Sequence, residues 1–402
     1  MFGRLMSLCC LAVFILLLAC GDKPTHPDTD KGTLVVLSDI DEAFVYIDEI
    51  LTSWTTPAEI ELDVKSYCVK VAKIGYVVDP ESLIVSLQKD VIDTAFFELT
   101  ASSDTAFLNI TANYDYVSIL IDGIPAEAFT PAFIPISSGG HEVVLEGWVF
   151  EGSYSQTVST SSSETTDVAF DLEFGPRVLI EEFSHVNCTN CPGAAASVHQ
   201  VVENFGDSVV SIEWHPQQSG GTDPFHVANP DIHDGRVTYY NFVGIPKVYV
   251  AGKPIVDPSS ISAITSYVDN YISYANDASK IKLWGIAKSN GDVFIGALAN
   301  GISVEGVIKI AVVEKHRTYS DPPGINGMTD FYNVPMEFYS YPVSGTIVLA
   351  DGEATYIELI EIDIPPGGTP ADYSYIVWFQ RDMDGVYTEG EDILCSPGIL
   401  NF

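Results

Sequence analysis

Short runs that alternate apolar and polar residues fill the first part of the chain. They include Leu34–Leu37, Ala43–Ile47 and Glu59–Leu62, and Asp, Gly and Pro residues separate them. Such alternation is typical of half-buried antiparallel strands, because successive side chains of a strand point to opposite faces of its sheet. We therefore expect this region to consist of small antiparallel β-sheets with one packed face.

This strand pattern occurs twice. In both copies an Ile-Asp pair precedes a Thr-Pro pair at the same spacing, as Ile47-Asp48 with Thr56-Pro57 and as Ile121-Asp122 with Thr130-Pro131. Repetition at a constant offset indicates two copies of one small domain, which we place at residues 33–100 and 104–173.

The order of these features resembles the PEGA family of small extracytoplasmic β-sandwich modules. The second copy keeps the family's turn as Ile121-Asp122-Gly123, whereas the first has Glu49 at the glycine position. The resemblance implies stalks that lift the next domain off a membrane, or adaptors that bind cell-wall or surface partners. Neither copy contains a cluster of catalytic residue types.

From residue 176 the pattern changes to strands that alternate with helices. Val178–Phe183 and Asp207–Trp214 have the character of buried strands, and apolar residues recur at helical spacing from Val198 to Phe205. A Cys188-Thr189-Asn190-Cys191 motif separates the first strand from that helix. The order of strand, CxxC loop and helix resembles the thioredoxin fold, so we expect a thioredoxin-like α/β domain over residues 176–275.

Two cysteines at CxxC spacing where a helix begins can form a small disulfide. The first thiol then faces free backbone N–H groups and the positive end of the helix dipole, which lowers its pKa. Because the thiolate is the attacking species in disulfide exchange, we expect Cys188 to be a solvent-accessible nucleophile and Cys191 to be the resolving thiol.

An acidic pair precedes the motif. Glu182 lies where thioredoxins carry a buried acid beneath the disulfide, and a buried carboxyl there has a raised pKa and can take the proton of Cys191. Alternation turns one of Glu181 and Glu182 inward, and the position favours Glu182. The alternative is that both acids simply flank a sheet edge.

A second segment of the same region also fits a redox site. Phe242–Pro246 followed by Lys247–Gly252 resembles the thioredoxin segment in which a cis-proline precedes a core strand. A cis bond there lets the backbone of the preceding residue face the cysteines and pair with a substrate peptide. Ile245 and Pro246 are therefore the expected substrate-binding residues.

The departures from ordinary thioredoxin indicate a narrower family. Asn187 stands where thioredoxin has tryptophan, Thr189-Asn190 replaces Gly-Pro, and residues 217–240 add length before the proline. Over residues 176 to about 400 the chain resembles the Omp-twenty-eight-type thioredoxin-like outer-membrane lipoprotein family. The shared pattern is a strand with Glu-Glu-Phe, then Cys-x-x-Cys-Pro, Asp-Pro-Phe, a Tyr-Tyr pair and a Gly-x-Pro strand. The resemblance implies export and a thioredoxin fold, and it leaves the substrate open.

Short alternating runs return in residues 280–402, among them Ile281–Ile286, Val293–Leu298 and Val307–Val313. Asn-Gly and Asp-Gly turns separate several of them, so we expect a C-terminal antiparallel β-sandwich. Asp382–Gly385 resembles part of a calcium loop, but the acids that follow do not fit the spacing of an EF-hand. We interpret this segment as a hairpin turn with solvated acids.

Residues 1–19 have the features of a secretion signal. Arg4 precedes an apolar run that is too short for an ordinary membrane span, and Leu17-Leu18-Ala19-Cys20 resembles the bacterial lipobox. We expect Cys20 to become the lipidated mature N-terminus and residues 20–32 to form a tether, so that the lipid anchors the protein to a membrane outside the cytoplasm. Gly21 favours the outer membrane, on its periplasmic or surface face. An uncleaved anchor or a plain secreted protein is the alternative.

The charge and the cysteines narrow the classes of partner. With 55 acidic and 18 basic residues, the formal net charge of −37 repels nucleic acid, so we expect no nucleic-acid partner.

Export places Cys68, Cys188, Cys191 and Cys395 where disulfides persist. Cys68 and Cys395 are most simply buried small side chains, and a disulfide between them cannot be deduced. No motif calls for a cofactor.

Three functions compete at the CxxC motif. The first is thiol–disulfide exchange on exported proteins, whose thiols or disulfides would be the partners. The second is a non-catalytic surface adhesion or scaffold lipoprotein in which the disulfide is structural. The third is a metal site of His185, Cys188 and Cys191 with His215 or His199. Zinc sites more often pair two CxxC motifs, or one with two spaced histidines, so we expect no metal.

Overall fold

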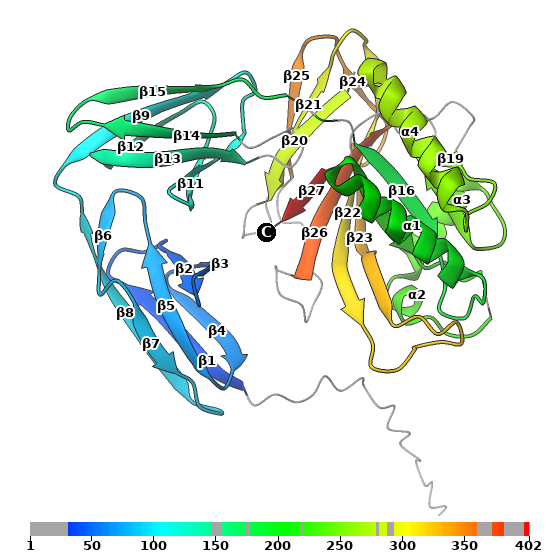
Figure 1. Ribbon diagram of the computed structural model, residues 1–402, viewed down its shortest axis with the longest axis horizontal. Coiled ribbons are helices and arrows are strands. Elements are labelled where there is room, and N and C mark those ends of the chain that lie inside the picture. The colour runs from blue at the N-terminus through cyan, green and yellow to red at the C-terminus, as the bar shows by residue number, and fades with distance from the viewer. Residues whose placement is uncertain are drawn as a thin grey trace, which may run out of the picture.

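The computed structural model describes residues 31–146, 154–173, 175, 177–218, 220–278, 281–287, 293–359, 372–381 and 398–401. The expected signal peptide, Cys20, most of the tether, the Asp382–Gly385 turn and Cys395 lie outside these residues. The described chain is mostly β-strand, in several sheets and more than one domain (Figure 1). None of the helices in the described part combines the length and apolar character that a membrane crossing needs.

The first repeat is a sandwich of two sheets of four strands each. One sheet has the order β4 (Ala58–Asp63), β1 (Lys31–Ser38), β8 (Ile92–Ala101) and β6 (Tyr76–Asp79), and the other has the order β3 (Ile50–Thr55), β2 (Phe44–Ile47), β5 (Ser66–Ala72) and β7 (Leu83–Ser86). The alternating apolar side chains of these strands, Leu34, Val45 and Phe97 among them, are fully buried in a single cluster.

The second repeat has the same plan. One sheet has the order β11 (Ile124–Phe129), β10 (Ser118–Ile121), β13 (Gly139–Glu146) and β14 (Tyr154–Thr160), and the other has the order β12 (Ala132–Ser137), β9 (Thr105–Ala112) and β15 (Thr165–Phe170). In both repeats one strand pair is parallel, β1 with β8 and β9 with β15. The expectation of purely antiparallel sheets was wrong on this point, because alternation shows which face of a strand is buried but not the direction of its neighbour.

The repeated Ile-Asp and Thr-Pro motif holds backbone groups of neighbouring strands. The Asp carboxylate accepts a hydrogen bond from one backbone N–H, and the buried Thr hydroxyl accepts one from another. The pairs are Asp48 with Cys68, Asp122 with Glu142, Thr56 with Ala43 and Thr130 with Val117. The hydrogen bonds to the two Thr hydroxyls are buried, and a buried N–H without a partner would cost about 1–3 kcal/mol, so the motif is accounted for by the fold of each repeat.

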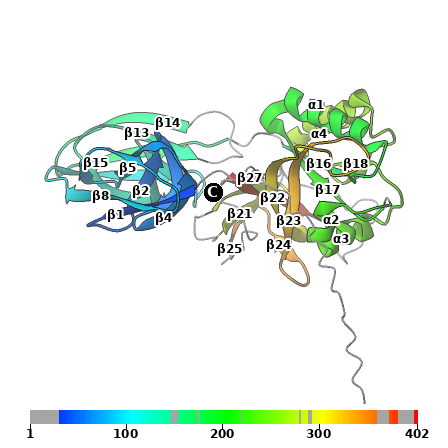
Figure 2. The ribbon, with the colours of Figure 1, turned by 90° about the horizontal axis from the view of Figure 1, so that it is seen from below.

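A mixed sheet forms the centre of the second half of the chain, with the order β17 (Val209–Trp214), β16 (Val178–Phe183), β18 (Lys247–Val250) and β19 (Lys253–Pro254). β16 runs parallel to β17 and antiparallel to β18. Helices α1 (Cys191–Phe205) and α4 (Ile261–Ala278) cover one face, and α2 (Pro224–Ala228) and α3 (Pro230–Tyr240) lie on the other side (Figure 2). Both faces of β16 are therefore covered, and all six of its residues are buried.

The remaining strands form two further sheets. One has the order β20 (Ile281–Ala287), β21 (Val293–Ala299) and β25 (Ala354–Leu359), and the other has the order β23 (Asp330–Tyr341), β22 (Val304–Thr318), β26 (Tyr373–Gln380) and β27 (Gly398–Asn401), with β24 (Ile347–Leu349) also paired to β22. One hydrophobic cluster joins these sheets to the mixed sheet and contains Phe183, Trp214, Ile310 and Trp378. The regions expected as separate domains at 176–275 and 280–402 thus share a core.

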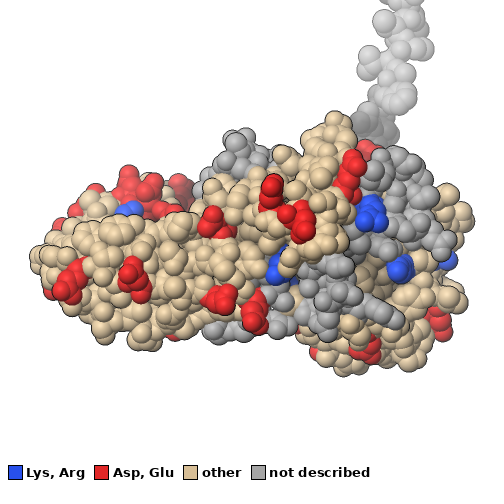
Figure 3. All heavy atoms as spheres, turned by 90° about the horizontal axis from the view of Figure 1, so that it is seen from above, with Lys and Arg blue, Asp and Glu red and all other residues tan. Residues whose placement is uncertain are grey.

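The second repeat packs against the C-terminal sheets. The indole N–H of Trp284 donates to the carbonyl oxygen of Asp115 at 2.8 Å, and the Trp284 side chain is buried in the core of that repeat. Tyr116 and Tyr356 also make a ring contact there, with centroids 4.6 Å apart. Acidic side chains are spread over the face drawn in Figure 3, with a few basic ones between them, in keeping with the strongly negative net charge.

Candidate functional site

The two cysteines of the CxxC motif form a disulfide, with an S–S distance of 2.11 Å and a Cα–Cα distance of 5.4 Å. Helix α1 begins at Cys191, and Pro192 lies in its first turn, where the missing N–H is no loss and the fixed φ suits the helix. The Cys188 N–H donates to the carbonyl oxygen of His185 at 2.9 Å, which closes a turn before the helix. Cys188 therefore lies just ahead of the amino end of α1.

The disulfide is less accessible than the sequence indicates. Cys191 is fully buried and Cys188 is only 6% exposed, although Thr189 and Asn190 between them are exposed. We expected an accessible Cys188 from the local sequence alone. That sequence does not show the side chains around Cys188, because they come from distant parts of the chain.

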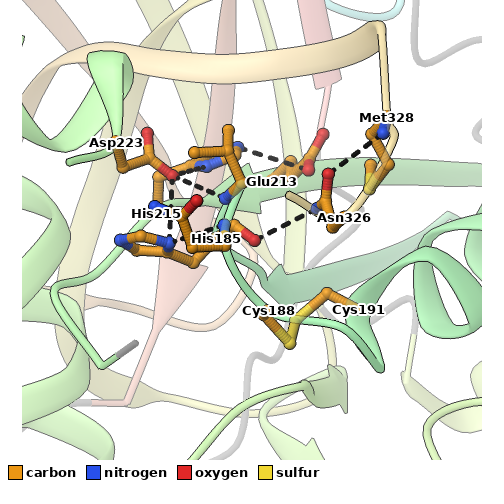
Figure 4. The surroundings of a disulfide bond; sticks show 10 residues. His185, Cys188, Cys191, Glu213, His215, Asp223, Asn326 and Met328 are labelled. Carbon is orange, nitrogen blue, oxygen red and sulfur yellow. Dashed lines mark hydrogen bonds and ion pairs between the residues drawn. A yellow bond between two sulfur atoms is a disulfide. The ribbon is translucent and has the colours of Figure 1, made fainter. Parts of the chain in front are cut away.

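The loop that joins β22 to β23, residues 319–329, packs on the turn before Cys188 (Figure 4). Asn326 donates from its backbone to the Val186 oxygen and from its side chain to the His185 oxygen, each at 3.1 Å. A Cβ on Gly324 would lie only 2.2 Å from the Val186 oxygen, so no larger residue fits there without movement. This loop from the C-terminal region holds the turn that carries the cysteine.

The peptide bond between Ile245 and Pro246 is cis, and both residues are partly buried. They lie immediately before β18, whose first residue, Lys247, pairs with Phe183 at the end of β16. The chain leaving β16 leads to Cys188, so the proline loop and the cysteine loop lie at the same end of the sheet.

The structure buries both acids that precede the motif, on opposite faces of β16. The Glu181 carboxylate accepts hydrogen bonds from Nε and Nη2 of Arg236 at 2.6 and 2.8 Å and from Nε1 of Trp214 at 3.1 Å. The Tyr240 hydroxyl donates to it as well. Sequence alternation predicted one buried acid and one exposed acid; both are buried because helices and strands cover both faces of this sheet.

Glu182 lies on the α1 face and, among the residues that the structure describes, has no salt bridge to an arginine like that of Glu181. Its Oε1 atom is buried and has no hydrogen-bond partner among the described residues. Burial raises the pKa of Glu182 well above its usual range, and the nearby Glu213 carboxylate raises it further, while His215 opposes the shift. Burial and the like charge of Glu213 therefore both favour the protonated form of Glu182.

Four buried polar residues lie close to the cysteine turn. His215 Nδ1 is 3.0 Å from Asp223 Oδ2. Its Nε2 is 3.2 Å from Glu213 Oε1, which is near enough for charge attraction, although Nε2 and Oε1 are not aligned for a hydrogen bond. The same Asp223 oxygen accepts a hydrogen bond from the backbone N–H of Val186 at 2.9 Å. The backbone N–H of His215 donates to Nδ1 of His233 at 3.1 Å. Asp223 thus links the histidine to the turn before Cys188.

The two buried histidines carry different charges. Burial alone would lower the pKa of His215, but the Glu213 and Asp223 carboxylates overcome it and raise the pKa to about 9. Burial and the neighbouring His215 charge lower the pKa of His233 to about 3. His215 is therefore a cation and His233 neutral at pH 7.

Sequence reasoning missed Glu213, Asp223 and His233, and it considered His215 only as a metal ligand. Two signals were present. The first is that Glu213 interrupts an apolar strand. The second is that Asp223 precedes Pro224, as a helix N-cap precedes a proline at the first helical position. In the structure the Asp223 side chain accepts hydrogen bonds from two backbone N–H groups of α2.

Stability of this region should fall as pH rises from about 6.5 to about 9. The folded pKa of His215 lies above its unfolded value, so its contribution is complete below about 6.5 and is lost as pH passes its folded pKa of about 9. The loss corresponds to about 3 kcal/mol. The raised pKa of Glu182 acts in the same direction. Urea unfolding at several pH values, followed by hydrogen exchange of the β16 amides, measures it.

His215→Asn should reduce this pH dependence, since the variant has no group at that position to titrate and only the contribution of Glu182 remains. The exposed His316, which pairs with Asp330, supplies the control, because His316→Asn should leave the slope between pH 6.5 and 9 unchanged. An unchanged slope in His215→Asn would assign the effect to another group.

The residues considered for a metal do not form such a site in the described part of the chain. There the structure has no group of at least three His, Cys, Asp or Glu side chains that could hold a metal ion, and the Cys188 and Cys191 sulfurs bond to each other. Cys68 is a free, partly exposed thiol, while Cys395 lies outside the described residues.

No family model matches the chain, and no curated protein matches it. Among solved structures, HBP35 of Porphyromonas gingivalis is 14% identical over 57% of this chain and 76% of its own length, with a TM-score of 0.46. A protein of Agrobacterium tumefaciens is 16% identical over 57% of this chain and 96% of its own length, with a TM-score of 0.41. The minor pilin GBS52 of Streptococcus agalactiae is 10% identical over 36% of this chain and 97% of its own length, with a TM-score of 0.17.

Proposed function

We propose that this protein is an exported, lipid-anchored, thioredoxin-like protein of the Omp-twenty-eight type that exchanges thiols and disulfides with other exported proteins. The observation that carries the proposal is the Cys188–Cys191 disulfide ahead of helix α1, at the end of the mixed sheet that also carries Pro246. Cys20 holds the chain on the outer membrane, and the two PEGA-like repeats space the redox domain from it or bind cell-wall or surface partners.

The residues around the disulfide divide the chemistry between them. In the reduced protein the Cys188 thiolate would lie next to the amino end of α1, whose first turn contains no acidic residue to offset the positive end of the helix. Cys191 resolves the mixed disulfide, Glu182 exchanges a proton with Cys191, and Ile245 and Pro246 bind the substrate backbone. No metal or cofactor enters these steps.

The test is the reduction potential of the Cys188/Cys191 pair in the full chain, measured together with refolding of a substrate that has scrambled disulfides. We expect a potential above about −300 mV and measurable exchange, because disulfides below that value resist reduction by thiol pools. A potential far below it, with no exchange on any substrate, would contradict the proposal.

The second candidate is a non-catalytic surface adhesion or scaffold lipoprotein with a structural disulfide. The burial of both cysteines and the contact of the 319–329 loop with the turn before Cys188 favour it. This candidate predicts the low potential and absent exchange described above, so the same measurement separates the two functions.

A further inference from the structure

A cavity of about 310 Å³ lies beside the disulfide, between α1, β17 and the segment that leads into β23. Pro192, the residue after Cys191, forms part of its wall, and Glu182, Glu213, His199, Asp330 and Tyr332 line it as well. A space of this size has room for several water molecules. The cavity therefore reaches the residue that follows the resolving cysteine and extends toward the side chains of α1 and β23.

Two buried carboxyl groups face this cavity from neighbouring strands. Glu182 and Glu213 are register partners in the parallel pair β16 and β17, so their side chains project from the same face of the sheet. Both are buried, and each has an Oε1 atom without a hydrogen-bond partner in the described part of the chain, although Glu213 Oε1 lies 3.2 Å from His215 Nε2. Such atoms are rare in folded proteins and need a reason.

Glu213 is also where the C-terminal sheets contact this site. Its Oε2 atom accepts from the Tyr332 backbone N–H at 3.4 Å, and the neighbouring Asn333 side chain donates to the Ser211 oxygen at 3.0 Å. These contacts fix β23 along the edge of β17. One wall of the cavity therefore belongs to the C-terminal region.

The charged and titratable groups around the pair come from every element packed against it. His215 follows Glu213 on the β17 side and is held by Asp223, His199 lies on α1, and Asp330 and Tyr332 lie on β23. On the remaining side, β18 places the apolar Val248 opposite Glu182. No lysine or arginine is among the residues that line the cavity in the described part of the chain.

We propose that Glu213 is a positioning residue that keeps a proton on Glu182, and that the cavity is the path by which this proton reaches solvent. This inference rests on the proposed disulfide exchange. A like charge at Glu213 disfavours ionisation of Glu182, and water in the cavity carries the proton to the surface.

In the direction that reduces a partner, Cys188 Sγ attacks the partner's disulfide, which breaks and releases one partner thiolate. Glu182 first releases its proton to water in the cavity, and the resulting carboxylate takes the thiol proton of Cys191. The Cys191 sulfur then attacks Cys188 Sγ. The mixed disulfide breaks, a second partner thiolate leaves with the electron pair, and Cys188 and Cys191 end as a disulfide. The proton on Glu182 leaves through the cavity.

The experiment is a carboxyl titration of the oxidised full chain by NMR, with ¹³C-labelled glutamate and Glu182→Gln to assign the signal. Glu213→Gln should lower the pKa of Glu182 by about one pH unit or more, because a neutral amide replaces a like charge. Glu203→Gln, which changes an exposed acid on α1 that pairs with His199, is the matched control and should leave the pKa unchanged.

The inference is overturned if Glu213→Gln leaves the titration of Glu182 where it is. If Glu213→Gln does not fold, the wild-type titration decides, since two interacting carboxyls give a coupled two-step curve and independent groups do not. The measurement uses the oxidised protein and needs no exchange activity. A shifted Glu182 with no exchange would therefore contradict the proposed function and leave the carboxyl pair standing.

Discussion

Replacing Cys188 by serine should reduce disulfide exchange to the uncatalysed background, whereas Cys191→Ser should leave a protein that forms mixed disulfides and does not release them. The difference follows from the geometry, because Cys191 is fully buried in the first turn of α1 and Cys188 is the sulfur with the residual exposure. The attacking thiol must reach the partner, while the resolving thiol needs only to reach Cys188. Mass spectrometry of trapped complexes and a refolding assay measure the two outcomes.

Cys68→Ser is the matched control for these variants. Cys68 is free and partly exposed on β5 of the first repeat, and it should contribute nothing to exchange. Trapping through Cys188→Ser instead of Cys191→Ser would reverse the assigned roles. Equal activity in all three variants would remove the CxxC motif from the function.

Arg236→Met should destabilise the mixed sheet by about 3–5 kcal/mol, because it leaves the buried Glu181 carboxylate without its cation. Arg236 and Glu181 are both almost completely buried, and two guanidinium nitrogens donate to the two carboxylate oxygens. Trp214 and Tyr240 still donate to Glu181 in the variant, which keeps the loss below that of an isolated charge. Urea unfolding with hydrogen exchange of the β16 amides measures it.

A second variant separates the charge from the packing. Glu181→Gln together with Arg236→Met removes the uncompensated charge and should recover part of the lost stability. Arg317→Met, which breaks a partly exposed pair with Glu314, should cost no more than about 1 kcal/mol. If Arg236→Met were as mild as Arg317→Met, the Glu181 pair would not stabilise the sheet as argued.

Periodicity and local chemistry predicted many elements of this chain, but not the helices α2 and α3 within residues 217–240. The alternation at Leu34–Leu37 lies within β1, and Val178–Phe183 matches β16. The two repeats have the same plan because the same Asp and Thr side chains hold the same backbone groups in each. The cis bond before Pro246 and the Cys188–Cys191 disulfide also involve residues close together in sequence, so their patterns are visible without a fold.

The partners of each element are decided only by the tertiary structure. Strand direction in β8 and β15, and the burial of Glu181 beside Arg236, depend on which segments cover each face of a sheet. The cavity needs Glu213 from β17 and Tyr332 from β23, and the turn before Cys188 needs Asn326 from a loop far along the chain. A local pattern shows which side chains of a strand share a face. Whether that face is buried, and which charge a side chain meets there, depends on long-range packing, and that charge influences its protonation.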